Sequence, residues 1–139
     1  MRPAPLALAL SLILTAGALA AGMTVKEEMK AVVDPATNTI FAVGGEVDPA
    51  NGPDAAKVPA ARWAEALKAA QALKKAAADL NGPQKQPGAD WTRSAADFAK
   101  LAAEAEAAAA KKDGAGFSTA ANGLGDTCTA CHSKYKTQS

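Results

Sequence analysis

Apolar residues along this 139-residue chain recur at helical spacing in four stretches, and glycines and prolines gather between those stretches. We therefore predict helices over about residues 24–44, 59–80, 90–112 and 115–136. Their apolar stripes consist, in chain order, of Val25, Met29, Val32, Ile40 and Val43; Trp63, Leu67, Ala70, Leu73, Ala77 and Leu80; Trp91, Phe98, Leu101 and Ala105; and Phe117, Leu124, Cys128, Cys131 and Tyr135. Nothing reads as a strand, so the pattern predicts an all-α fold, an antiparallel four-helix bundle.

The first predicted helix is interrupted by the pair Asp34-Pro35. Aspartate is a favoured N-cap and proline is favoured at the first helical position, so the pair is typical of a helix start. The segment is then either one kinked helix or two short helices in series. We expect the glycine pair Gly44-Gly45 to end it.

Composition supports helices and leaves the core thin. Alanine is abundant and aromatic residues make up only 4% of the chain, which favours helix over sheet. A core so poor in large side chains needs something else to fill its middle. The chain has 15 basic and 14 acidic residues, and this near balance argues against a nucleic-acid partner, which would require a basic face.

The first 20 residues have the pattern of an export signal. Arg2 gives a positive start, residues 6–19 are apolar, and residues 18–20 place small side chains at the two positions that a signal peptidase reads. We expect cleavage after Ala20 or a residue or two later, which leaves one domain over residues 21–139 in the periplasm. The alternative is a retained membrane anchor, but a spanning helix needs about 20 apolar residues and this run is shorter.

A Cys-x-x-Cys-His motif stands near the C-terminal end. In a helix, Cys128, Cys131 and His132 lie at positions i, i+3 and i+4 and share one face. Two thiols there can add to the two vinyl groups of a haem, and the imidazole can reach the iron from the same side. This is the sequence mark of c-type haem attachment, so we predict one covalent haem c on the C-terminal helix.

Two other chemistries use similar residues. A thioredoxin-like redox pair also has Cys-x-x-Cys, but it belongs to an alternating strand–helix pattern that this sequence lacks. A zinc site needs four ligands or an open fourth position, and the sequence has no second ligand cluster. Haem is therefore the favoured interpretation.

The second axial position of the iron has three options: it is empty, bound by methionine, or bound by an unusual ligand such as lysine. His132 is the only histidine in the sequence, which excludes a second histidine from this chain. Met23 would lie at the start of the mature chain, whereas Met29 lies one turn after Val25 on the apolar face of the first helix. Met29 is either a core filler, which is the usual role of a helical methionine, or the second ligand of a Met/His pair.

The chain resembles the class II cytochromes c, the group of cytochrome c-prime and cytochrome c-556. The resemblance rests on the ending Cys-x-x-Cys-His-x-x-aromatic-basic, which spans residues 128–136, and on Trp91 and Phe98, seven residues apart. It implies a left-handed bundle with haem between the helices, thioethers from both cysteines and axial ligation by His132. It also implies that Lys136 is the basic residue near the haem, although an ordinary charged residue at a helix end is the alternative.

The family's distal residue, early in the first helix, is methionine in the c-556 type and a blocking apolar residue in the c-prime type. Met29 matches the ligand version. We therefore expect a monohaem electron carrier with no enzymatic activity, and a five-coordinate haem protein that binds a gas such as nitric oxide is the alternative. Expected partners are redox proteins and the haem-attachment machinery, and the family also includes homodimers.

Overall fold

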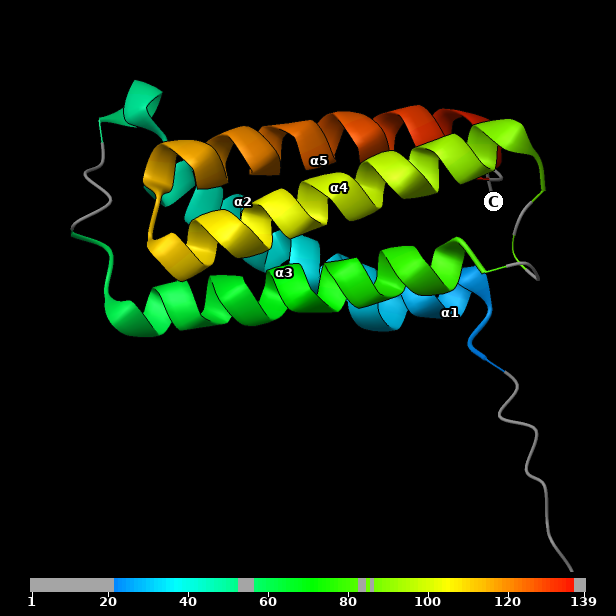
Figure 1. Cartoon of the computed structure of the whole chain (residues 1–139), viewed down its shortest axis with the longest axis horizontal. Helices are drawn as coiled ribbons and strands as arrows, with labels where there is room; N and C mark the ends of the chain where they lie inside the picture. Colours follow the sequence, from blue (N-terminus) through cyan, green and yellow to red (C-terminus); the bar gives the residue numbers. More distant parts are fainter. Residues whose placement is uncertain (1–21, 53–56, 83–84, 86, 137–139) are drawn as a thin grey trace, which may run out of the picture.

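The structure, a computed structural model, describes residues 22–52, 57–82, 85 and 87–136. The predicted export signal lies outside these residues. Each predicted helix is present (Figure 1), and its ends fall within about two residues of those expected from the sequence. The helical elements are α1 (Val25–Glu28), η1 (Met29–Val33), α2 (Asp34–Glu46), η2 (Pro49–Asn51), α3 (Ala60–Leu80), α4 (Ala89–Lys111) and α5 (Gly114–Tyr135).

These elements form an all-α four-helix bundle. Elements α1, η1 and α2 follow one another without a break and make up its first helical rod. The rod, α3, α4 and α5 alternate in direction, so neighbours in the chain are antiparallel (Figure 1). In the bundle α2 packs against α3 and α5, and α4 packs against the same two helices. Among the described helices, none is both long and apolar enough to cross a membrane.

The first rod begins at Val25, well before Asp34, and its regular α-helix α2 starts at Asp34 with Pro35 in the first turn, although Asp34 is not an N-cap. The start is a capping box at Thr24, whose hydroxyl accepts from the Glu27 N–H at 3.3 Å while the Glu27 carboxylate accepts from the Thr24 N–H at 2.9 Å. Asp34 and Pro35 lie inside the rod, directly after the five-residue π-helical turn η1. Of the two alternatives, the structure therefore has the single helix, with a local distortion just before Asp34 and Pro35.

The glycine pair does not end the first rod. Both residues are helical, and the rod continues to Glu46. A Cβ on Gly44 would lie 2.8 Å from the Cβ of Ala121, whereas a Cβ on Gly45 would meet nothing within 4 Å. Gly44 is therefore needed for the close approach of α2 to α5 rather than for a turn.

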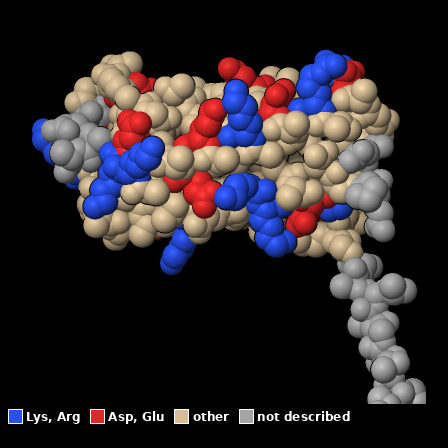
Figure 2. Space-filling model, viewed as in Figure 1, with Lys and Arg blue, Asp and Glu red and all other residues tan. Residues whose placement is uncertain are grey.

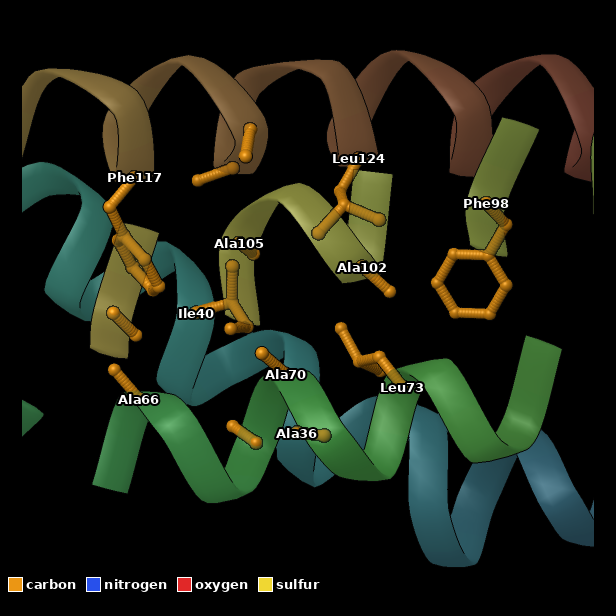
Figure 3. Packing of buried hydrophobic residues seen from close by; sticks show 14 of the residues in the cluster. Ala36, Ile40, Ala66, Ala70, Leu73, Phe98, Ala102, Ala105, Phe117 and Leu124 are labelled. Atoms are coloured by element: carbon orange, nitrogen blue, oxygen red, sulfur yellow. The ribbon is translucent and has the colours of Figure 1, made fainter. Parts of the chain in front are cut away.

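The core is thin, as the composition predicts. Phe117, Leu124, Ile40 and Leu73 are fully buried and meet between the helices, with several buried alanines around them (Figure 3). Most of the core positions on α3 and α4 are alanines, so these helices approach each other closely along their length. Basic and acidic side chains alternate over the face seen in Figure 2, and neither sign dominates it.

Candidate functional site

A hollow opens at the end of the bundle where α3 ends and α4 begins. Its volume is about 480 Å³ when the space that opens to solvent is counted. The residues that line it come from every helix of the bundle: Met29, Val33, Leu80, Trp91, Ser94, Ala95, Phe98, Thr127, Cys128, Cys131 and His132. Of the five residues predicted from the sequence to hold the haem, all but Lys136 therefore line this one hollow.

Helix α5 supplies the motif side of the hollow. Cys128 and Cys131 are half-buried and free, and His132 is exposed beside them. All three line the hollow from adjacent turns of one helix, as the spacing i, i+3, i+4 predicts. Burial raises the pKa of both thiols, and the neighbouring Cys131 adds to the effect at Cys128. The thiols are therefore protonated at neutral pH in the protein without haem.

The first rod supplies the opposite side. Met29 is half-buried and lines the hollow together with Val33, one helical turn later. The sequence predicted Val32 for the apolar stripe, yet Val33 is the buried residue, with 6% exposure. Val33 lies seven residues before the buried Ile40, a spacing that also shares one face of an α-helix, and Val32 is partly buried against the core. Met23 is exposed and lies outside this hollow.

Helix α4 forms the wall between these two sides. Trp91 and Phe98 are both buried at 6% exposure and line the hollow, as their seven-residue spacing on one helix face requires. The Trp91 N–H donates to the carbonyl of Leu80 at 2.8 Å, which fixes the indole against the end of α3. The wall is therefore mostly apolar: its indole N–H is already paired, and Ser94 supplies a hydroxyl.

Contacts from α4 hold the end of α5 in place. The rings of Trp91 and Tyr135 meet edge to face, with centroids 5.1 Å apart. Next to them, the ammonium of Lys134 lies 2.6 Å from a carboxylate oxygen of Asp90. Both contacts fall just after the Cys-x-x-Cys-His motif, so they set the position of the helix turn that bears His132.

Lys136 does not line the hollow. It caps α5, its backbone N–H donates to the His132 carbonyl at 3.1 Å, and its side chain is exposed. The role in cofactor binding that the family resemblance implies stays a prediction. The position itself is that of a basic residue at the negative end of a helix.

One polar feature next to the hollow was missed from the sequence. Glu28 precedes Met29 and is 1% exposed, and its carboxylate lies 2.5 Å from the ammonium of Lys85. Lys85 lies in the segment between α3 and α4, 57 residues away in the chain. A single glutamate in an amphipathic helix carries no sequence signal of burial, so this pair could not be predicted.

The donor set fits a c-type haem. Two thiols and one imidazole face an apolar hollow from one helix, and a thioether faces it from another. Within the described part of the chain, no group of three or more His, Cys, Asp or Glu side chains could hold a bare metal ion. The arrangement thus fits a flat apolar cofactor that is attached through its edge and ligated at its centre, and it does not fit a zinc site.

Comparison with known proteins agrees with this chemistry. Residues 85–136 match the family model described as Cytochrome C'. The match takes in all of α4 and α5, and with them Trp91, Phe98 and the Cys-x-x-Cys-His motif. Met29 and the first rod lie outside it. No curated protein and no solved structure matches the chain.

Proposed function

We propose that this chain, a class II c-type cytochrome of the cytochrome c-prime family, is a monohaem electron carrier whose iron is held by His132 and Met29. One observation carries the proposal. Met29 lines the same hollow as Cys128, Cys131 and His132, although about a hundred residues separate it from them in the sequence. A thioether opposite an imidazole is a common pair of axial ligands in cytochromes c.

The bound haem would supply the one-electron chemistry of its iron. The chain's own residues then have separate tasks. Cys128 and Cys131 would hold the cofactor's edge through thioethers, and His132 would ligate from the side of α5. Trp91 and Phe98 supply a water-poor apolar wall, which raises the cost of a net charge on the iron and so tunes its potential.

The place of action follows from the chemistry and the leader sequence. Haem is attached to Cys-x-x-Cys-His motifs outside the bacterial cytoplasm, and the first 20 residues have the pattern of an export signal. We therefore place the carrier in the periplasm, where it exchanges electrons with other redox proteins. Such partners need only a transient contact near the haem edge.

The test is the optical and resonance Raman spectrum of the purified holoprotein in both oxidation states. We expect a low-spin wild type, and a high-spin Met29→Ala variant because the iron then loses its sixth ligand. Met23→Ala is the matched control, since Met23 is 41% exposed and lies outside the hollow. This control is expected to keep the wild-type spectrum.

A high-spin wild type that Met29→Ala leaves unchanged would contradict the carrier proposal. The iron would then be five-coordinate and its distal side would be lined by apolar residues. The function would be binding of a small uncharged gas such as nitric oxide. Gas titration of the reduced protein would measure that affinity directly.

A further inference from the structure

The turn that carries Met29 has an unusual geometry. Element η1 (Met29–Val33) is a π-helical turn, and the Asp34 N–H donates to the Met29 carbonyl five residues back instead of four. Single π-helical turns inside α-helices are rare and are found frequently at functional sites. Here α-helix precedes and follows the turn without a break.

Pro35 explains why the distortion lies here. A proline inside a helix has no N–H to donate, and its ring collides with the carbonyl four residues earlier, which is that of Ala31. A wider turn moves that carbonyl away. The hydroxyl of the buried Thr37 supports the distorted stretch, because it donates to the carbonyls of Val33 at 2.8 Å and Asp34 at 3.0 Å.

The π-helical turn changes the direction of everything that precedes it. It contains one residue more than an α-helical turn, and each residue of an α-helix rotates the chain by about 100°. Met29 stands at the start of the π-helical turn, while the fully buried Ile40 and Val43 follow it in α2. In an uninterrupted α-helix packed through Ile40 and Val43, Met29 would therefore point about 100° away from its present direction.

We infer that Pro35 is a positioning residue for the distal side of the haem. By enforcing the π-helical turn, it directs the Met29 side chain into the hollow lined by the cysteines and His132. The inference rests on the proposed axial role of Met29. Pro35 itself does not line the hollow.

The first test replaces the proline. In Pro35→Ala the N–H is restored and the ring is removed, so the turn is free to return to α-helix, which alanine favours strongly over proline. We expect most of the low-spin methionine signal to be lost, and a high-spin spectrum like that of Met29→Ala to replace it. Pro49→Ala is the control, because Pro49 is exposed in η2 and lies outside the hollow. This variant is expected to keep the signal.

The second test restores the direction of the Met29 side chain in a protein that lacks the proline. Deleting the exposed Ala31 from the Pro35→Ala variant removes the extra residue, so a regular α-helix again points Met29 into the hollow. We expect the low-spin spectrum to return. A variant that is merely destabilised would not recover by losing a further residue, and recovery is expected even where Pro35→Ala alone gives no folded protein.

Two results would overturn the inference. One is an unchanged methionine signal in Pro35→Ala, and the other is a high-spin or unfolded double variant. Met29→His separates this question from the proposed function, since a histidine directed at the iron gives a low-spin bis-histidine spectrum whether or not methionine binds. If wild type is high-spin, the carrier proposal fails. The positioning role still stands if Met29→His is low-spin and becomes high-spin with Pro35→Ala.

Discussion

The indole N–H of Trp91 donates to the carbonyl of Leu80 at 2.8 Å, and this bond ties the first turn of α4 to the last residue of α3. A carbonyl at a helix C-terminus has no donor within its own helix, so the indole satisfies a group that would otherwise be buried unpaired. Both residues line the hollow. The bond therefore holds α3 and α4 together at the end of the bundle that contains the hollow.

Trp91→Phe is expected to destabilise the protein by about 1–3 kcal/mol more than Trp63→Phe. The two substitutions remove the same atoms from buried tryptophans, with 6% and 3% exposure. Trp63 Nε1, however, has no hydrogen-bond partner within the described part of the chain. Urea denaturation measures the difference, and equal losses would show that the Leu80 bond contributes nothing.

We expect alanine substitutions at the two glycines of α2 to change the stability in opposite directions. Gly44→Ala would place a Cβ 2.8 Å from the Ala121 Cβ, so α2 and α5 must separate. We expect a net loss of roughly 1–2 kcal/mol. Gly45→Ala meets nothing within 4 Å and should stabilise the helix by about 0.5–1 kcal/mol. Thermal unfolding of the two variants checks this, and equal effects would contradict the close-packing role of Gly44.

Because Glu28 and Lys85 form a buried pair, we expect the stability of the fold to depend strongly on the lysine. Lys85→Met leaves a carboxylate with 1% exposure facing an apolar side chain, which should cost on the order of 3 kcal/mol. Lys75→Met is the control, because the Lys75 side chain is 77% exposed, and we expect little change.

Neutralising the glutamate tests the cause of that loss. Glu28→Gln combined with Lys85→Met should recover most of the stability, since no charge is then left buried. Chemical denaturation of the single and double variants gives the comparison. A double variant as unstable as Lys85→Met would show that the loss comes from packing of the lysine stem.

The pair of Asp90 and Lys134 predicts a pH dependence at the end of α5. A hydrogen bond from Lys134 holds the pKa of Asp90 below its ordinary value of 3.8. A carboxyl whose pKa is lowered in the folded protein stabilises the fold when the pH is above its ordinary pKa. This contribution is lost as the pH falls through the lowered pKa. The stability that wild type has over Asp90→Asn should thus be present at neutral pH and vanish in strong acid.

Thermal unfolding of both proteins as a function of pH measures this effect. Lys134→Met should abolish it as well, and combining the two substitutions should add nothing further. A constant difference between wild type and Asp90→Asn at every pH would contradict the ion pair as its source. Both side chains are more than half exposed, so the effect should be small and should weaken with added salt.

Much of this protein could be predicted from local patterns in its sequence. Helical periodicity marked the four helices, because the turn of a helix repeats regardless of what it packs against. The spacing of Cys128, Cys131 and His132 predicted a shared helix face for the same reason. The wall residues Trp91 and Phe98 followed from their spacing as well.

Features that depend on packing between distant segments could not be predicted from these local patterns. Local rules made Asp34 an N-cap and Gly44-Gly45 a helix end, but Asp34 is itself helical and the helix runs through both glycines to Glu46, where α2 packs closely on α5. Periodicity allowed either Val32 or Val33 on the apolar face, and only the packing shows that Val33 is the more deeply buried of the two. The burial of Glu28 also depends on Lys85, whose place in the fold is set by the chain between α3 and α4.

Met29 lies between these two cases. The sequence identified two methionines in the mature chain and favoured the one on an apolar helix face. Its presence in the hollow depends on the bundle bringing the first and last helices together, and on a turn whose extra residue α-helical periodicity does not contain. Spacing along one helix determines which residues share a face, but only packing between helices determines what that face meets.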